Sequence, residues 1–434
     1  MIGNIFDPDP EKTGAFMLRL MKKLYPICWS ITGNGVRETL GIIGKHIPLE
    51  VVEVPSGTKV FDWTVPPEWN IRDAYIRRVT GEKVVDFRVS NLHVLNYSVP
   101  VKGMISLEEL KQHLHTLPEY PDWIPYLSSY YRENWGFCLS HNQMKELRDP
   151  FYDVCIDSTL APGSLTYGEC LIRGESEEEI VFSTYVCHPS LCNDNLSGPV
   201  LVALLAKELA KTRPRYSYRF LFIPETIGAI TWLAQHEEML GKIRYGFVVT
   251  CVGDRGPSTY QRTRSGTSLI DTIAEKVLAD SGTEYRIRNF TPISSDERQY
   301  SSPGINLPFG SLMRTTYDDF PEYHTSSDNL GLMDPLSLAD SYRKYLEIVY
   351  ILENNSTYLN LNPRCEPQMG RRGLYDSIGG RKELPFDRRG LFWVMNFSDG
   401  EHSLLDIAIR SGLKFREIRR AADILTDHGL LRKI

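Results

Sequence analysis

Hydrophobic and polar residues alternate along the chain with two main periods, and each period predicts one kind of element. Residues 11–46 read as helical, because Phe16, Leu20 and Leu24 recur every four positions and so share one face. A Gly-Asn-Gly turn at 33–35 interrupts this pattern. We expect two helices here that pack against the rest of the protein.

Residues 51–106 change to short runs of alternating character, which are typical of β-strands. Runs at 73–79 and 83–89 flank a turn, and another run follows at 92–97. We expect these residues to form a small β domain inserted into the chain.

From residue 152 to about residue 355, apolar strands alternate with helical stretches, which predicts an α/β sheet flanked by helices. Buried strands are expected at 179–187, 218–223 and 245–252, and helices at 198–210 and 231–240. Sheets of this kind hold their ligands in loops at the carboxyl ends of the strands. We therefore expect the chemistry in those loops.

A linker rich in Pro, Arg and Gly at 360–380 precedes a compact C-terminal unit. Ser403 and Asp406 have the spacing of a capping box at the start of a helix, and apolar residues at spacings of three and four mark a second helix from 415 to 425. With the short apolar strand that follows, this order predicts a winged helix-turn-helix domain. The expected domains are 1–50 together with 107–360, 51–106, and 361–434.

Composition places the 434-residue chain among ordinary soluble globular proteins, with 42% hydrophobic and 24% charged residues. No apolar run approaches the roughly 20 residues that a membrane span needs, and the first residues lack the features of a secretion signal. The eight cysteines form no CxxC pair, which fits a reducing compartment. We expect a cytoplasmic protein that does not bind membranes.

Charge is unevenly divided: the chain carries a net charge of −6, yet residues 364–434 hold 14 Lys and Arg against 10 Asp and Glu. Arg416, Arg419 and Arg420 lie on the second helix of the expected winged helix, which is the helix that enters a DNA groove in such domains. Arginines on an amphipathic helix are more often its solvated face. DNA binding stays open, docking to a partner chain or to the rest of the protein is favoured, and a homo-oligomer is compatible with the sequence.

Two candidate metal ligands follow the first buried strand of the α/β region. His188 comes directly after that strand, and Asp194 comes six positions later, before an apolar helix. Each residue alone has an ordinary explanation, since a lone histidine is usually a structural residue and an aspartate before a helix is usually its N-cap. Their presence on one short loop makes them candidates together.

A third and a fourth candidate stand in later loops. Glu225 follows the next strand among apolar neighbours, which would raise its pKa as a general base requires, although a solvated carboxylate at a helix start has the same pattern. His324 lies four positions before Asp328, which could orient its ring.

The order of these residues resembles the co-catalytic zinc aminopeptidases of the bacterial leucyl aminopeptidase type, to which glutaminyl cyclases and glutamate carboxypeptidases are also similar. That family shows a strand ending in His, then Asp-Asp/Asn-x-Ser-Gly, Glu-Glu-x-Gly, a strand ending in Asp, and a late His-Thr-x-x-Asp. The resemblance implies a mixed sheet, Zn²⁺ on His188, Asp194 and His324, and Glu225 as the base.

The chain also departs from that pattern. Thr226 and Thr250 stand where the family has two further metal ligands. Three protein ligands suit a single catalytic zinc with an open position, so we expect one Zn²⁺. A second ion remains open, because Asp254, Asp296 or Glu297 could supply other ligands.

The pair Asp296 and Glu297 also has two other readings. With Ser295 it is similar to a Ser-Asp-His segment near the substrate pocket of that family, so these acids could hold a free amino group of the substrate. Equally, they could form ion pairs with Arg298 and be structural.

A wider resemblance covers nearly the whole chain. The segments Cys187-His188-Pro189-Ser190, 224–228 and 322–325 are similar to a bacterial family of aminopeptidase-like proteins, often described beside polysaccharide biosynthesis. We expect a zinc-dependent hydrolase that cleaves an amide bond next to a free amine, in a peptide or a small amide. The alternative is a non-catalytic metal-binding module that recognises a peptide, a sugar or a modified amine.

Overall fold

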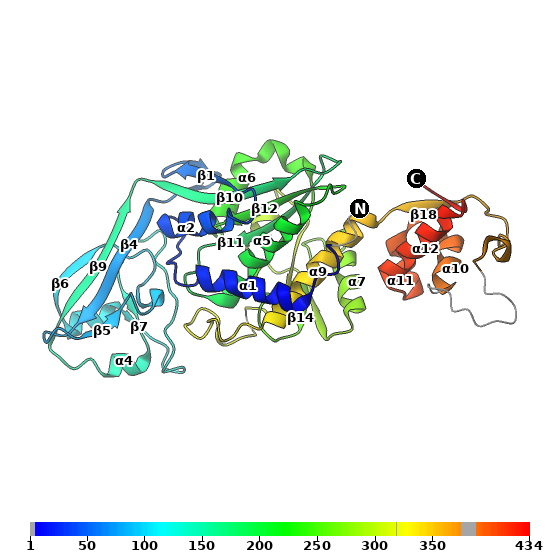
Figure 1. Cartoon of the computed structure of the whole chain (residues 1–434). Coiled ribbons are helices and arrows are strands. Elements are labelled where there is room, and N and C mark those ends of the chain that lie inside the picture. Colours follow the sequence, from blue (N-terminus) through cyan, green and yellow to red (C-terminus); the bar gives the residue numbers. More distant parts are fainter. Residues whose placement is uncertain (1–4, 318, 375–387) are drawn as a thin grey trace. The chain divides into compact units, whose positions relative to one another are not determined.

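The structure is a computed structural model that describes residues 5–317, 319–374 and 388–434 (Figure 1). It divides into two compact units. The first comprises Met1–Asp271 and Thr283–Arg343, and the second comprises Thr272–Gly282 and Lys344–Ile434. No helix among the described residues is long and apolar enough to cross a membrane.

An eight-stranded mixed sheet forms the centre of the first unit (Figure 1). In spatial order its strands are β1 (Glu50–Pro55), β10 (Ser164–Ile172), β12 (Ser217–Ile223), β11 (Glu179–Tyr185), β13 (Ile243–Val248), β16 (Phe309–Met313), β14 (Ser258–Gln261) and β15 (Tyr285–Arg288). The four strands β12, β11, β13 and β16 run parallel, whereas β1 and β10 are antiparallel to their neighbours. The predicted mixed sheet flanked by helices is confirmed.

Burial explains why the pattern of apolar residues predicted the central strands. Every residue of β11 and β12 is buried, so these strands appear as unbroken apolar runs rather than as alternating ones. Two helices follow them, α5 (Ser197–Leu209), which is buried over most of its length, and α6 (Ile227–Gln235). Each strand therefore passes its chain through a short loop into a buried helix.

The N-terminal pattern produced the two expected helices, α1 (Pro10–Leu24) and α2 (Asn34–Ile43). Asp9 caps α1 by accepting from two backbone N–H groups, and α1 packs on α5. Gly33, just before α2, has a φ of 96°, and a Cβ there would lie 2.1 Å from the Trp69 carbonyl oxygen. Only glycine fits this close approach.

A second, antiparallel sheet has the order β5 (Lys83–Asp86), β4 (Glu68–Arg77), β9 (Phe151–Ala161) and β6 (Val101–Ser106). Its central strand β9 lies outside 51–106, and β1 pairs with the large sheet instead. The strand expected at 92–97 is wrong, because Asn91–His93 is a 3-10 turn. The domain boundaries remain predictions, but strand pairing crosses the expected limits of the insertion.

The remaining helices and strands complete the described chain. They are β2 (Lys59–Val60), β3 (Trp63–Thr64), α3 (Leu107–Leu110), η2 (Lys111–His113), β7 (Leu114–His115), β8 (Phe137–Cys138), α4 (His141–Lys145), η3 (Cys192–Leu196), η4 (Glu237–Lys242), α7 (Leu269–Ser281), α8 (Glu297–Tyr300), α9 (Pro335–Asn354) and η5 (Gly370–Arg372). One buried core joins residues of both sheets, among them Trp69, Tyr152 and Leu221. The two sheets of the first unit are therefore packed as one body.

The second unit contains the winged helix. Its helices are α10 (Arg388–Phe397), α11 (Leu404–Ser411) and α12 (Phe415–Asp427), and its three-stranded sheet has the order β18 (Asp399–Ser403), β17 (Thr357–Asn360) and β19 (Leu431–Lys433). Ser403 and Asp406 form the predicted capping box at the start of α11. The winged helix-turn-helix prediction is confirmed.

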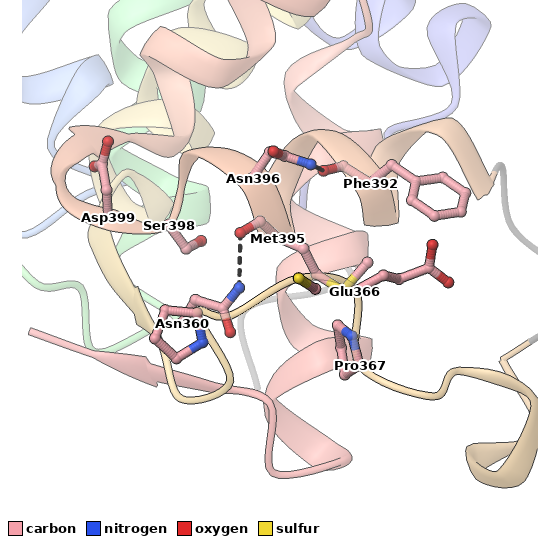
Figure 2. A pocket seen from close by; sticks show the side chains of 10 residues that line it. Asn360, Glu366, Pro367, Phe392, Met395, Asn396, Ser398 and Asp399 are labelled. Carbon is pink, nitrogen blue, oxygen red and sulfur yellow. Dashed lines mark hydrogen bonds between the residues drawn. The ribbon is translucent and has the colours of Figure 1, made fainter.

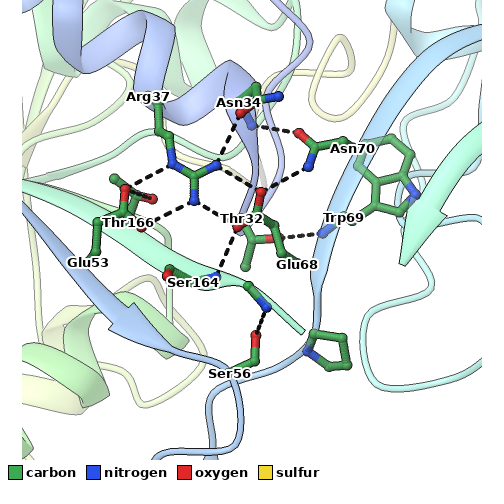
Figure 3. Close-up of polar contacts among 12 residues, drawn as sticks. Thr32, Asn34, Arg37, Glu53, Ser56, Glu68, Trp69, Asn70, Ser164 and Thr166 are labelled. Atoms are coloured by element: carbon green, nitrogen blue, oxygen red, sulfur yellow. Dashed lines mark hydrogen bonds and ion pairs between the residues drawn. The ribbon is translucent and has the colours of Figure 1, made fainter. Parts of the chain in front are cut away.

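A polar cluster around Arg37 ties α2 to both sheets (Figure 3). The guanidinium donates two hydrogen bonds to Glu68, of 2.8 and 2.7 Å, and two to Glu53 on β1, of 2.8 and 3.1 Å. Glu68 begins β4 and also accepts from the backbone N–H of Ser164. Its hydrogen bonds to Arg37 hold the pKa of the Glu68 carboxyl at about 2, well below its ordinary value.

Replacing Arg37 by Met should destabilise the first unit by about 1–2 kcal/mol at pH 7, because two carboxylates then face each other unpaired. The Glu68 pKa is lowered in the folded state, so its stabilisation is complete above about 4.5 and fades as the pH falls toward 2. Urea unfolding at pH 7 and at pH 3 measures both effects. The matched control is Arg72→Met, which removes a bidentate but exposed pair with Asp157 and should shift the midpoint far less.

Candidate metal centre

The four principal candidate residues lie in loops beside the central parallel strands. His188 and Asp194 occupy the loop between β11 and α5, Glu225 lies between β12 and α6, and His324 lies in the loop between β16 and α9. Because β11, β12, β13 and β16 are parallel, their carboxyl ends meet at one edge of the sheet. The fold thus brings together residues far apart in the sequence.

Three of these residues form a compact cluster. Ligand atoms of His188, Asp194 and His324 all lie within 4.8 Å of one another. His324 Nε2 is 3.0 Å from Asp194 Oδ2, and the two imidazole rings are 5.1 Å apart between centroids. His188 and Asp194 are buried, so the cluster is held largely out of water.

The donor atoms of the cluster fit a cation. Asp194 Oδ2 and His324 Nε2 are buried and make no well-directed hydrogen bond with the described residues, although they face each other at 3.0 Å. Buried polar atoms are rarely left without a partner. Two histidines and one aspartate are the ligand types that Zn²⁺ takes in catalytic sites, where a fourth position stays open. Zn²⁺ bound here would be held by His188, Asp194 and His324.

The protonation states of His188 and Asp194 also fit metal binding. Burial lowers the pKa of His188 to about 4, so its imidazole is neutral at pH 7 and free to act as a ligand. Burial raises the pKa of Asp194, but the nearby His188 and the contacts with His324 and Tyr185 together bring it below its ordinary value. The carboxylate is therefore charged. A neutral imidazole beside a charged carboxylate is the state that binds a metal ion.

Neighbouring groups fix the Asp194 loop. The Tyr185 hydroxyl donates a short hydrogen bond to Asp194 Oδ1, and the Asp328 carboxylate accepts from the backbone N–H groups of Asn193, at 2.6 Å, and Asp194, at 2.9 Å. Sequence spacing predicts that Asp328 orients the ring of His324. In the structure the Asp328 carboxylate holds the backbone of the Asp194 loop instead.

His188 is oriented by a thiol. Cys187 Sγ lies 3.3 Å from His188 Nδ1, which leaves Nε2 to face the cluster. The same sulfur accepts from the backbone N–H of Glu225 at 3.3 Å. Cys187 therefore links the first candidate ligand to the candidate base.

Glu225 lies within reach of the cluster and is partly open to solvent. Its Oε2 is 3.8 Å from His188 Nε2, and its Oε1 accepts from the Ser295 hydroxyl at 2.8 Å. Burial, followed by the negative charge of Asp194, raises the pKa of the carboxyl to about 7. A carboxyl that titrates near neutrality can both take and return a proton.

The other candidate acids lie outside the metal cluster. Asp296 Oδ1 accepts from the backbone N–H of Thr226 at 2.7 Å, and Glu297 Oε2 accepts from Ser294 at 2.8 Å. No ion pair joins either acid to Arg298 in the described parts of the chain, where Arg298 donates to Thr226 Oγ1 at 3.3 Å. Both carboxylates are fully buried.

Asp254 also stands apart from the cluster. Its carboxylate accepts from the Asn193 side chain at 3.0 Å and from the Thr315 hydroxyl at 2.5 Å. The hydroxyl of Thr250, which replaces a ligand of the resembled family, bonds to Tyr185 at 2.7 Å. In the described residues, the other group that could hold a metal is Cys187, His188 and Glu225, which shares His188 with the first.

Three residues that contact the candidate ligands were not predicted from the sequence as site residues. Tyr185 and Cys187 belong to the strand and loop that carry His188, so their nearness along the chain was a usable signal. Tyr126 had no such signal, because it lies in a different region of the sequence. Its ring is 5.2 Å from the rings of both His188 and His324.

The fold and this site define an aminopeptidase-like protein that carries a C-terminal winged helix. The chain is similar in fold to a zinc aminopeptidase from Bacillus subtilis, with a TM-score of 0.58 at 10% identity over 80% of this chain and 95% of that one. It is also similar to a peptidase M28 precursor from Shewanella amazonensis, with a TM-score of 0.53 at 12% identity over 80% of this chain and 95% of that one. These likenesses concern the fold alone.

Family membership rests on nearer relatives. Residues 18–355 match the family described as a domain of unknown function (DUF4910), and residues 356–433 match a winged helix-turn-helix family. A Clostridium acetobutylicum protein, whose name joins polysaccharide biosynthesis with an aminopeptidase-like domain, is 59% identical over 431 residues, 99% of each chain. A crystal structure from that organism has a TM-score of 0.94 at 58% identity over 98% of this chain and 97% of that one. The chain belongs to this DUF4910 family.

Metal binding should depend on the cluster. Zn²⁺ titration of metal-free protein, followed by competition with a chromophoric chelator, should give one tight site per chain. His324→Ala should weaken it by at least about 100-fold, and Asp328→Asn by about 10–100-fold through the loosened Asp194 loop. The control is His236→Ala, whose ring stacks on Trp232 away from the cluster and should leave affinity unchanged. Wild-type affinity in His324→Ala would show that the metal binds elsewhere.

Proposed function

We propose that this protein is a zinc-dependent amide hydrolase of the aminopeptidase type. The observation that carries the proposal is the convergence of His188, Asp194 and His324 on one buried point, where two of their ligand atoms make no well-directed hydrogen bond with the described residues. Glu225 lies beside this point with its pKa raised to about 7. The zinc aminopeptidase fold of the first unit supports the same reading.

Each residue has a role that its surroundings support. Zinc held by the three ligands would lower the pKa of a water to roughly 7 and polarise the amide carbonyl. Glu225 takes the proton from the attacking water and returns it to the leaving amine, and Ser295 holds its other oxygen in place. Tyr185 and Asp328 keep Asp194 fixed while charge changes nearby.

The proposed substrate class is taken from the likeness in fold. An amide next to a free amine follows from the likeness to zinc aminopeptidases. Asp296 does not support recognition of that amine, because its side chain is buried and its Oδ1 already accepts from the Thr226 N–H. The relative's name adds polysaccharide biosynthesis, so N-acylated amino sugars belong in the substrate panel beside peptides.

A non-catalytic metal-binding module is the second candidate function. It is favoured by Thr226 and Thr250, which stand where the resembled enzymes have ligands for a second ion. The two functions share the metal cluster and differ in whether Glu225 moves a proton.

Replacing Glu225 by Gln separates them. If the protein is a hydrolase, the variant should lose about 10²–10⁴-fold in kcat, because amide replaces the proton-accepting carboxylate while the ligands stay. Release of amine from a panel of peptides and N-acylated amino sugars measures kcat, and zinc content and thermal midpoint should match the wild type. Zinc-loaded wild-type protein that binds panel members without cleaving them would identify the binding module.

We infer that the winged helix serves packing rather than reading of DNA. DNA-binding domains of this class place the N-terminal residues of the second helix against base edges. Here, within the second unit, Phe415 at the start of α12 is buried against Tyr350, and the Leu413 carbonyl accepts from Lys276 at 2.8 Å. We infer that packing contacts within the second unit already cover the start of α12.

Charge supports this inference. Of the three arginines on α12, Arg416 pairs with Glu347 at 2.6 Å and Arg419 pairs with Asp423 at 2.7 Å, while Arg420 is exposed. A cavity of about 380 Å³ in this unit is lined by Glu366 and Asp399, and none of its described lining residues is Lys or Arg (Figure 2). The cavity therefore offers no positive charge to a phosphate backbone.

Duplex DNA should therefore bind weakly. Fluorescence anisotropy of the full chain with a mixed-sequence duplex should give a Kd no tighter than about 10⁻⁶ M at physiological salt, the tight end of non-specific binding. Arg420→Ala should leave that value unchanged within about two-fold, because on this inference the helix that carries Arg420 makes no phosphate contact. A Kd near 10⁻⁸ M that weakens steeply with salt would contradict the inference.

A further inference from the structure

Residues 124–131, which precede β8 and β9, are attached to the loop that carries His324. The Tyr126 N–H donates to the His324 carbonyl at 2.7 Å, the Ser326 N–H donates to the Ile124 carbonyl at 2.8 Å, and the Ile124 N–H donates to the Ser326 hydroxyl at 2.9 Å. Three hydrogen bonds over three residues form a small ladder. The segment is therefore held at a fixed position relative to the metal cluster.

Tyr126 brings this segment into direct contact with the candidate ligands. Its buried ring lies 5.2 Å from the rings of both His188 and His324, and its hydroxyl bonds to the hydroxyl of Tyr130 at 2.8 Å. The two hydroxyl groups are therefore hydrogen-bonded to each other. The segment thus brings three tyrosine side chains to the space beside Glu225.

A cavity of about 380 Å³ opens at this place. The segment supplies five of its lining residues, Tyr126, Leu127, Ser128, Tyr130 and Tyr131, and the others are Ile31, Cys187, His188, Glu225, Thr226 and His324. None of the five carries a charge. Arg298 is not among the lining residues, although its guanidinium reaches Thr226.

The lining continues outward as exposed aromatic rings. Tyr131 is 52% exposed and packs edge-on against Trp63, which is 38% exposed, with centroids 5.4 Å apart. Tyr131 has a φ of 66°, a conformation that a bulky residue adopts only at a cost. Large apolar side chains left exposed beside a cavity mark a place where a ligand binds.

We propose that Tyr126, Tyr130, Tyr131 and Trp63, here called the aromatic wall, form the subsite that selects the substrate. It accepts a neutral group with a flat apolar face next to the amide that Glu225 attacks, and it excludes charged groups, which would lose their water against uncharged rings. The proposal rests on the proposed function of the site, since it places the scissile amide at Glu225.

The test uses a matched series of amides that differ only in this group: phenylalanine, alanine, aspartate and lysine p-nitroanilides. Wild-type zinc-loaded protein should cleave the phenylalanine amide with a kcat/KM at least about 100-fold above those of the two charged amides. Tyr131→Ala should lower kcat/KM for the phenylalanine amide about ten-fold through KM, while the alanine amide changes less than two-fold. Tyr120→Ala, which removes an exposed ring stacked on Trp123 outside the cavity, should change neither.

Binding of the same series to the zinc-loaded Glu225→Gln protein, measured by calorimetry, separates this proposal from the proposed function. If the wild type cleaves nothing but the phenylalanine amide binds preferentially and loses that preference in Tyr131→Ala, hydrolysis is wrong and the subsite stands. Equal binding or cleavage of charged and aromatic amides overturns the subsite. So does an unchanged preference in Tyr131→Ala, or no binding of any member at millimolar concentration.

Discussion

The buried negative charge of Asp194 is the constraint on which the site depends. A carboxylate taken out of water is costly unless other groups compensate it. Here Tyr185 satisfies one oxygen, and the other faces His324 Nε2 at 3.0 Å without a well-directed hydrogen bond. The neighbouring backbone is held by Asp328, so the loop cannot turn the carboxylate toward solvent. A cation bound between Asp194 and His324 would compensate this buried negative charge.

Strain is distributed around the same point. Thr226 has a φ of 62° and His324 a φ of 55°, both in the left-handed region, where residues other than glycine cost about 1–3 kcal/mol. Each is held by a specific contact: Asp296 accepts from the Thr226 N–H, and Tyr126 donates to the His324 carbonyl. Asp296 and Tyr126 therefore stabilise the strained backbone beside the candidate ligands.

Much of this could be predicted from the sequence, for identifiable reasons. Strands β11 and β12 are buried on both faces, so their apolar runs and the loops after them were visible, and His188, Asp194 and Glu225 stand in those loops. The limits of the second sheet were not visible, because β9 reaches it from beyond the expected insertion and pairing partners are not encoded locally. Contacts such as that of Tyr126 depend on tertiary structure and leave no periodic trace in the chain.

The separate origins of the candidate metal ligands and the aromatic wall bear on how such proteins can diverge. The candidate ligands stand in loops of the large sheet, where the parallel strands fix their positions. Tyr126, Tyr130 and Tyr131 belong instead to a stretch with little regular structure, attached to the His324 loop by a few backbone hydrogen bonds. Substitutions or changes of length in that stretch can alter which molecules fit the cavity. The positions of His188, Asp194 and His324 need not change. Relatives with the same cluster can therefore act on different molecules.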